Sequence, residues 1–323
     1  MGTAIHDEVE AFLAEWTDDR EHVTGHTSGS TGPARRVDLP KRDMLASAAL
    51  TNDFFGITSR STLLLCLSPA YIAGKMMIVR ARLAGARLVA VEPGGDPLAA
   101  LDGPVDLAAM VPLQVAKGLS RPGGWSLLRQ VIIGGAALDP ALEGRLREVP
   151  TACYASYGMT ETASHVALRR VNGPLASPLY VALGETRFAT DDRGCLVIDA
   201  PHLQQRRVVT NDLVRLVDPA RFEWLGRVDH VINSGGVKLS PEVIEARLAP
   251  LLSRRFFITA EPDPRLGERV LLVVEGPPWR EDERARLVER FSGVLSPRER
   301  PRAIRFLPAF CETPSGKLLR TLE

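Results

Sequence analysis

The first half of the chain alternates short continuous apolar runs with longer segments of helical spacing. Runs such as residues 62–67 (TLLLCL) are typical of strands buried on both faces, and residues 42–55 place apolar side chains on one helix face. Repeated alternation of this kind predicts an α/β fold with parallel sheet. The expected strands are residues 62–67, 86–91, 105–111, 129–133 and 151–155, and the expected helices are residues 1–16, 42–55, 72–84, 112–119 and 139–147.

The pattern changes twice after residue 164. Short alternating segments separated by turn residues predict an antiparallel sheet appended to the α/β part, at residues 178–189, 194–199, 206–210 and 213–217. A compact α+β unit follows, with strands at 230–233, 254–260, 269–275 and 302–307 and helices at 241–252 and 281–292. We expect a large N-terminal domain, residues 1–228, with mainly parallel sheets and a small antiparallel part, and a small α+β C-terminal domain, residues 229–323.

Composition narrows the class of protein. The chain has 323 residues, 45% apolar and 24% charged, as expected for a globular protein with a core, and its formal net charge of +1 gives no sign of a nucleic-acid or membrane partner. Four widely spaced cysteines indicate neither a zinc site nor a disulfide framework. No apolar run is long enough to span a bilayer. We expect a cytoplasmic protein with small-molecule partners. The sequence is compatible with a homodimer but does not determine the oligomeric state.

Residues 24–33 (TGHTSGSTGP) form the most unusual stretch, with three glycines, several hydroxyls and no large apolar side chain. Such a run predicts a loop whose backbone N–H groups and hydroxyls can hold phosphate oxygens. A Gly/Ser surface linker explains the composition equally well. A mononucleotide P-loop is excluded, because Pro33 rather than lysine follows Gly32.

Two further stretches follow expected strands. Residues 134–137 (GGAA) would let a flat ring lie against backbone, although a tight turn is an equal alternative. Residues 157–162 (YGMTET) combine an aromatic face, a hydroxyl and a carboxylate that could hold Mg²⁺. Taken alone, this stretch is better explained by a core tyrosine and a helix-start carboxylate.

Two weaker signals come later. Asp212, at the end of an expected strand, could accept the hydroxyls of a ribose, although turn aspartates are commoner. Lys317, in residues 313–317 (TPSGK), could reach a developing negative charge, although a solvated tail lysine is the default. No Gly-x-Gly-x-x-Gly follows the first strand, which argues against a Rossmann dehydrogenase.

The ordered set TSGSTG, GGAA, YGMTET, TND, GRVDHVINSGGVKLSPEVIE and TPSGK resembles the acyl- and aryl-CoA synthetases, which are adenylate-forming enzymes. The resemblance extends over the chain from about residue 24, although family members are usually longer. The short form, with residues 67–81 (LSPAYIAGKMMIVRA) and TNDLV, is most similar to the o-succinylbenzoate–CoA ligases of menaquinone biosynthesis. ATP, Mg²⁺ and CoA are the implied cofactor and co-substrates.

The resemblance assigns roles to matching positions. The ATP phosphates would be held by Thr27, Ser28, Ser30, Thr31 and Gly32, the adenine by Gly134, Gly135, Ala136 and Tyr157, and the ribose by Asp212 and Arg227. Thr160 would contact the α-phosphate, Glu161 would bind Mg²⁺ and Lys317 would stabilise charge in adenylation. Asp229 matches the hinge of a mobile C-terminal domain, and Gly235, Gly236 and Lys238 match its CoA-facing loop.

Some positions depart from the family or concern the acid. The family's glycine loop usually continues with Lys-Pro-Lys, whereas this chain has Pro33-Ala34-Arg35-Arg36, and we expect one of these arginines to replace the lysine. The second carboxylate of o-succinylbenzoate needs a cation or donors, for which Lys75, Ser156 and Ser164 are candidates. The alternatives are a ligase for another aryl or fatty acid and a non-catalytic nucleotide-binding homologue.

Overall fold

The computed structural model describes residues 4–26, 36–121, 123–311 and 318–322. Its helices are α1 (Ala4–Thr17), α2 (Lys41–Phe55), α3 (Ile72–Ala84), α4 (Pro112–Gly118), α5 (Pro140–Leu146), α6 (Pro241–Leu248) and α7 (Glu281–Val294). The helices lie within a few residues of those expected. Within the described residues, no helix is both long and apolar enough to cross a bilayer.

An eleven-stranded sheet forms the centre of the N-terminal part, in the order β10-β11-β12-β13-β9-β8-β7-β6-β5-β3-β4. Its members are β3 (Thr62–Leu65), β4 (Arg87–Ala90), β5 (Val105–Met110), β6 (Leu128–Ile133), β7 (Ala152–Met159), β8 (Ser164–Arg170), β9 (Leu179–Ala182), β10 (Arg187–Thr190), β11 (Cys195–Asp199), β12 (Arg207–Asp218) and β13 (Arg221–Arg227). Strands β4, β3, β5, β6 and β7 pair in parallel. The remaining pairs, from β7 and β8 onward, are antiparallel.

The predicted α/β class is confirmed, with corrections inside the sheet. The antiparallel part is not small, and it continues the parallel sheet edge to edge. Strand β7 runs on to Met159, so Tyr157 lies within a strand rather than after it. The expected strands 206–210 and 213–217 are one strand, β12, and Asp212 lies in its middle. The expected strand 178–189 is two strands, β9 and β10, and strands β8 and β13 were not predicted.

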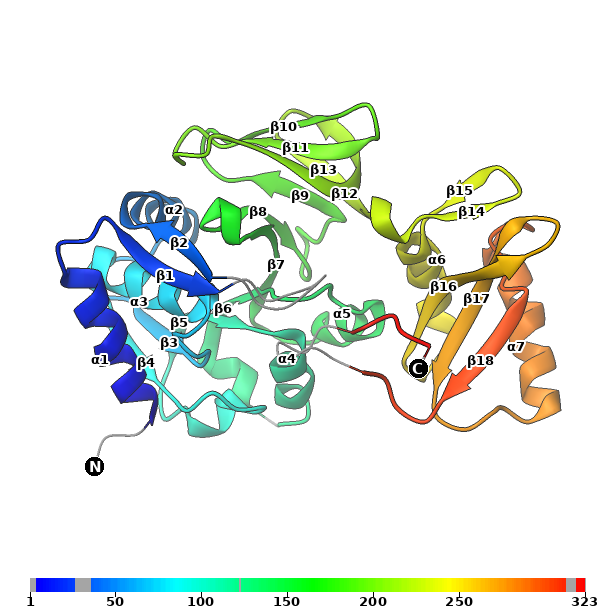
Figure 1. The fold of residues 1–323 in the computed structure, drawn as a ribbon. Coiled ribbons are helices and arrows are strands. Elements are labelled where there is room, and N and C mark those ends of the chain that lie inside the picture. Colours follow the sequence, from blue (N-terminus) through cyan, green and yellow to red (C-terminus); the bar gives the residue numbers. More distant parts are fainter. Residues whose placement is uncertain (1–3, 27–35, 122, 312–317, 323) are drawn as a thin grey trace.

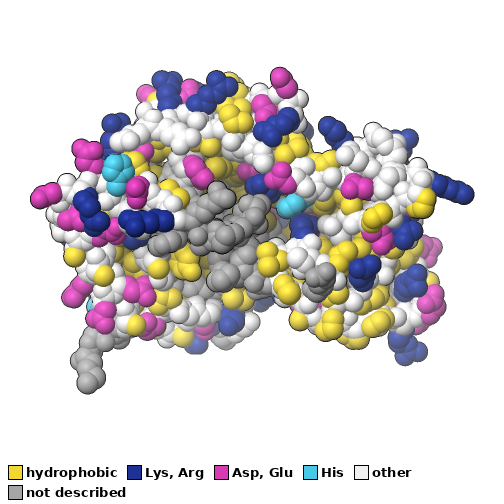
Figure 2. Space-filling view, in the orientation of Figure 1, with side chains coloured by type: hydrophobic (Ala, Val, Ile, Leu, Met, Phe, Trp, Pro, Cys, Tyr) yellow, Lys and Arg dark blue, Asp and Glu magenta, His cyan; other side chains and the backbone are white. Residues whose placement is uncertain are grey.

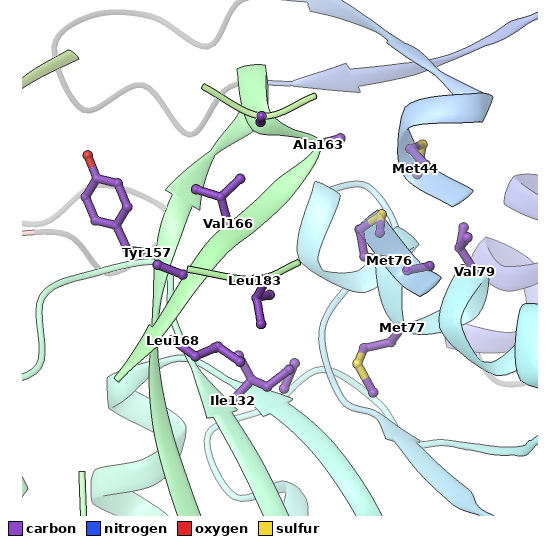
Figure 3. Close-up of a cluster of buried hydrophobic side chains, with 14 of the residues drawn as sticks. Met44, Met76, Met77, Val79, Ile132, Tyr157, Ala163, Val166, Leu168 and Leu183 are labelled. Atoms are coloured by element: carbon purple, nitrogen blue, oxygen red, sulfur yellow. The ribbon is translucent and has the colours of Figure 1, made fainter. Parts of the chain in front are cut away.

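Both faces of the parallel strands are buried, as their continuous apolar runs predict. Along β3, Leu63 and Leu65 join the core under α1, α2 and α3, whereas Leu64 joins the core under α4 and α5. Successive side chains of a strand point to opposite faces, so one apolar run supplies two cores. Figure 3 shows the first of these cores, where Met44, Met76 and neighbouring side chains of α2 and α3 face the sheet.

A small hairpin precedes α2. Strand β1 (His22–His26) pairs antiparallel with β2 (Arg36–Pro40). Residues 27–35, which contain most of the glycine-rich stretch, connect these neighbouring strands and lie outside the described residues.

The C-terminal part contains a five-stranded sheet of its own with helices α6 and α7, drawn to the right in Figure 1. Its strands are β14 (Ile232–Ser234), β15 (Val237–Leu239), β16 (Phe256–Asp263), β17 (Gly267–Glu275) and β18 (Ala303–Leu307). Alternate residues of β17 again supply two cores, Leu272 on the α6 and α7 side and Leu271 on the other. Over the face shown in Figure 2, basic and acidic side chains are interspersed, as the small net charge suggests.

Candidate active site

The loop after strand β6 lies directly against strand β7. A Cβ atom at Gly134 would lie 2.4 Å from Ser156 Oγ, so a side chain there would have to displace this hydroxyl. Gly135 has φ +86°, which favours glycine. Ser156 Oγ donates to the Ile133 carbonyl at 3.2 Å. The segment from Gly134 to Ala136 therefore brings nearly bare backbone to the carboxyl end of the parallel sheet, where α/β folds bind ligands.

Strand β7 carries Tyr157 to a carboxylate from the antiparallel part of the sheet. Tyr157 Oη donates to Asp212 Oδ2 at 2.7 Å, and in Figure 3 the hydroxyl points away from the methionine cluster. Burial, and then the charge of Asp212, raises the pKa of Tyr157, so the phenol remains a donor. Trp224 Nε1 donates to Asp212 Oδ1 at 3.2 Å. Arg227 Nη1 lies 3.9 Å from the same oxygen.

Thr160 and Glu161 lie in a 3-10 turn, η3 (Thr160–Thr162), directly after β7. Ala163 and Ser164 follow with φ +49° and +123°, values uncommon for residues with side chains and typical of functional sites. Glu161 is exposed, and among the described residues no cluster of three His, Cys, Asp or Glu could hold a metal. One exposed carboxylate fits Mg²⁺ beside a nucleotide, because this ion takes few protein ligands and completes its shell with phosphates and water.

A buried polar cluster lies between α2, α3 and β8, immediately after this turn. Arg80 is 2% exposed, and its Nη2 donates to Ser164 Oγ at 3.1 Å. His165 Nδ1 lies 3.3 Å from Ser164 Oγ, and its Nε2 lies 3.3 Å from Thr51 Oγ1. Arg80 Nη1 contacts Met77 Sδ at 3.5 Å, and Nε has no hydrogen-bond partner among the described residues.

No carboxylate of the described residues pairs with the Arg80 guanidinium. Burial lowers the pKa of Arg80 to about 9, so the side chain is still cationic at neutral pH. An unpaired buried cation is costly and therefore points to an anionic ligand. Sequence analysis did not single out this residue, although an arginine in the apolar run MMIVRA was the available signal.

Lys75 lies elsewhere on α3, and its expected role needs correction. The ammonium lies 3.4 Å from Glu15 Oε2 of α1 and 4.5 Å from the centroid of the Phe12 ring. With 6% of its surface exposed, Lys75 is a buried residue with an internal partner, not a free cation for a substrate. Sequence spacing could not show this, because Glu15 is 60 residues away.

The junction between the two parts of the chain is held by ion pairs. Arg227 Nη2 donates to Asp229 Oδ2 at 2.6 Å, and Asn211 Nδ2 lies 3.3 Å from both oxygens of Asp229. The Arg227 hydrogen bond lowers the pKa of Asp229. Asp229 lies in the 3-10 turn η4 (Val228–His230), between β13 and β14. The predicted hinge residue is thus attached to both β12 and β13.

The predicted CoA-facing residues lie in the hairpin of β14 and β15, with the two glycines in its turn. Gly235 and Gly236 have φ +57° and +78°, which favour glycine. Lys238 lies on β15, opposite Asn233, and is exposed. Other predicted residues lie outside the described residues, namely Thr27, Ser28, Ser30, Thr31, Gly32, Arg35 and Lys317. Arg36, which begins β2, donates from Nη2 to Thr24 Oγ1 at 3.2 Å.

The family described as AMP-binding enzyme matches residues 15–191. This range contains the Gly134 loop, Tyr157, Glu161 and the Arg80 cluster. The chain belongs to the AMP-binding enzyme family. Asp212 and the C-terminal part follow the matched range.

Curated relatives of this AMP-binding enzyme include a protein of Mycobacterium tuberculosis named "Probable 2-succinylbenzoate--CoA ligase". It is 30% identical over 317 residues, which cover 89% of this chain and 80% of the relative. The "2-succinylbenzoate--CoA ligase" of Escherichia coli is 27% identical, covering 82% of this chain and 61% of the relative. The chain is thus shorter than both proteins.

Solved structures resemble the fold over almost its whole length. The "acyl-CoA synthetase (AMP-forming)/AMP-acid ligase II-like protein" of Dyadobacter fermentans is 36% identical with a TM-score of 0.67, covering 99% of this chain and 93% of that one. The o-succinylbenzoate CoA synthetase of Bacillus subtilis, in complex with ATP and magnesium ion, has a TM-score of 0.75 at 19% identity, covering 92% and 68%. The latter likeness concerns the fold alone.

Proposed function

We propose that this AMP-binding enzyme is an ATP-dependent 2-succinylbenzoate–CoA ligase of menaquinone biosynthesis. The family supports acid–CoA ligase chemistry, and the names of the curated relatives support this acid. The reaction has two steps. The acid carboxylate attacks the α-phosphorus of ATP, giving acyl-adenylate and pyrophosphate, and the CoA thiol then displaces AMP to form the thioester.

The buried guanidinium of Arg80, which pairs with no carboxylate in the described part of the chain, is the observation that carries the choice of acid. 2-Succinylbenzoate has two carboxylates, of which the succinyl group is activated and the ring carboxylate keeps its charge. A buried charge needs a partner of opposite sign, and Arg80 offers one beside Ser164, three residues after Glu161. A monocarboxylic acid, once activated, would leave this cation uncompensated. In our proposal Arg80, rather than Lys75, is therefore the cation that pairs with the ring carboxylate, and Ser164 and His165 are neighbouring polar groups.

The remaining roles follow the sequence predictions. The adenine would lie between the Gly134 loop and Tyr157, with its ribose on Asp212, and Thr160 would contact the α-phosphate. Glu161 would hold Mg²⁺, which neutralises phosphate charge when bound. The β- and γ-phosphates would be held by the loop of Thr27, Ser28, Ser30, Thr31 and Gly32, with Arg35 or Arg36 in place of the usual lysine.

We further propose that residues 1–228 and 229–323 act as two domains that rotate about Asp229. The cores support this division, because those of the N-terminal part end at Phe222 and those of the C-terminal part begin at Ile232. Two chemical steps at one site suit such a rotation. One orientation would present Lys317 for adenylation, and the other would present Gly235, Gly236 and Lys238 to CoA.

CoA-dependent AMP formation tests the proposed acid. The substrates are 2-succinylbenzoate, 4-oxo-4-phenylbutanoate (the same skeleton without the ring carboxylate), benzoate and a medium-chain fatty acid. We expect a clear preference for 2-succinylbenzoate over the analogue without the ring carboxylate. Equal or faster turnover of benzoate or the fatty acid would point to another acid–CoA ligase. ATP binding without turnover of any acid would point to a non-catalytic homologue.

The variant Arg80→Met tests whether the buried cation causes the preference for 2-succinylbenzoate. Hydrogen bonds to charged groups contribute about 1.5–3 kcal/mol, so we expect KM for 2-succinylbenzoate to rise at least about tenfold. KM for 4-oxo-4-phenylbutanoate should hardly change. Because methionine removes an unpaired buried charge, the variant should melt no lower than the unaltered protein. An equal rise in KM for both acids would contradict the role of Arg80.

A further inference from the structure

The carboxylate of Asp212 is held on both oxygens by protein donors. Tyr157 Oη binds Oδ2 at 2.7 Å and Trp224 Nε1 binds Oδ1 at 3.2 Å. A carboxylate has about four acceptor positions, two on each oxygen. Within the described ranges no other hydrogen bond reaches these oxygens, which leaves one position on each and matches the two neighbouring hydroxyls of a ribose. About 13% of the side chain of Asp212 is exposed, so it lies at the surface of the site.

A bulge in strand β13 brings the Trp224 side chain to this carboxylate. Asp212 is opposite Arg227 and Leu213 is opposite Gly226, but Val214 is opposite Trp224, so Leu225 is an extra residue. Opposite residues of a strand pair share a face of the sheet. In a regular ladder Trp224 would be opposite Arg215 and would point to the other face. The bulge turns it to the face of Asp212, as bulges beside active sites commonly do.

Gly226 makes the bulge possible. It has φ +130°, where side chains are strained, and a Cβ there would lie 2.3 Å from Glu242 Oε2. The backbone conformation that aims Trp224 thus occurs directly before Arg227 and the junction to the C-terminal part.

We propose that Trp224 is a positioning residue that orients the Asp212 carboxylate for a vicinal diol, and so sets the preference of the site for ribonucleotides. This inference rests on the proposed nucleotide site. Trp224 does not touch the nucleotide in this account. It fixes the rotation of the carboxylate by occupying one acceptor position of Oδ1, as Tyr157 does on Oδ2, so that both remaining positions face the ribose.

Equilibrium binding of AMP and of 2′,3′-dideoxy-AMP tests the proposal without any acid or CoA. The variant Trp224→Phe keeps an aromatic side chain at this position but loses the indole N–H donor. We expect its Kd for AMP to rise about five- to tenfold and its Kd for dideoxy-AMP to change little. The preference for AMP over dideoxy-AMP should therefore fall by the same factor, which a merely structural change would not cause.

Trp16→Phe is the matched control, because Trp16 packs against Phe12 of α1 and has no contact with Asp212. It should keep both dissociation constants. Unchanged discrimination in Trp224→Phe, or an equal loss of affinity for both nucleotides, would overturn the proposal. If the unaltered protein bound neither nucleotide, the proposed function itself would fail. Tight AMP binding without turnover of any acid would leave the role of Trp224 standing.

Discussion

His165 is a buried base whose ionisation the fold opposes. Its ring nitrogens lie 3.3 Å from Ser164 Oγ and Thr51 Oγ1, both uncharged groups. Burial, and then the charge of Arg80, holds the pKa of His165 well below its ordinary value of 6.5. The ring is therefore neutral in the folded protein at neutral pH, with Arg80 as the nearby cation.

This arrangement predicts a loss of stability in mild acid. Above pH 6.5 His165 is neutral in both the folded and unfolded states, so it contributes no pH dependence. Below pH 6.5 only the unfolded chain takes up the proton, and the free energy of unfolding falls. Between pH 7.5 and 5.5 this residue should account for a loss of about 1.4 kcal/mol.

Denaturant unfolding of His165→Gln at both pH values measures this contribution. The variant should lose about 1.4 kcal/mol less than the unaltered protein over the interval. Burial also lowers the pKa of His202, which keeps its contribution in both proteins. His22→Gln, at an exposed position, should leave the pH dependence unchanged. Identical pH dependence in His165→Gln and the unaltered protein would refute the assignment.

At the scale of elements, the contact between β7 and β8 depends on Gly158. A Cβ at this position would lie 2.1 Å from the Ser164 carbonyl oxygen and 2.5 Å from His165 Cα. Both atoms belong to the backbone, so neither can turn aside. The register of the two strands also shifts at this residue. Gly158 therefore permits the geometry that places the turn of Glu161 beside the buried polar cluster.

Gly158→Ala should destabilise the protein by about 2–4 kcal/mol, because β7 and β8 must separate to admit the methyl group. Gly144 in α5 is the matched control, since a Cβ there would meet no atom within 4 Å. Gly144→Ala should stabilise by about 0.5–1 kcal/mol, as expected for a glycine within a helix. Chemical denaturation measures both changes. Equal effects of the two substitutions would show that the close approach at Gly158 is relieved elsewhere.

At the scale of the whole molecule, the C-terminal tail is attached to the helix that contacts the junction. Arg320 pairs with Glu245 and lies 3.5 Å from Glu242 Oε1, while His230 Nδ1 lies 2.5 Å from the same atom of Glu242. Ser240 Oγ donates to the Leu225 carbonyl of β13 at 2.6 Å. The segment after Lys317 and the turn of Asp229 are thus joined through α6, and we expect them to move together.

Lys317→Ala and Lys238→Ala should separate the two half-reactions. Loss of Lys317 should slow adenylation at least about 100-fold, because it removes a cation from a transition state that gathers negative charge. Thioester formation from supplied acyl-adenylate should be largely kept. Lys238→Ala should slow thioester formation and largely keep adenylation. The measurements are acid-dependent pyrophosphate exchange and CoA-dependent AMP release. Equal loss of both half-reactions in Lys317→Ala would contradict its role.

The order of strands and helices could be predicted from sequence because each depends on neighbouring residues. Apolar runs predict buried strands, and helical spacing predicts one-sided helices, without knowledge of what covers them. The glycine loop and the YGMTET stretch were recognisable for the same reason, since their chemistry lies within a few residues. Strands β8 and β13 were missed and β12 was divided, although β8 pairs with β7, and β13 with β12, across short turns. Polar and charged residues interrupt their sequences, so they lack the continuous apolar run that predicts a buried strand.

Local sequence determined which residue types and loops this protein has, whereas the tertiary structure decided which of them meet. Tyr157 and Asp212 are 55 residues apart, and Arg80 and Ser164 are 84 apart. Lys75 and Arg80 lie on one helix, yet only packing gave Lys75 a carboxylate partner and left Arg80 without one among the described residues. The free-energy cost of a buried charge depends on the groups that surround it in space. A single sequence does not show which groups those are.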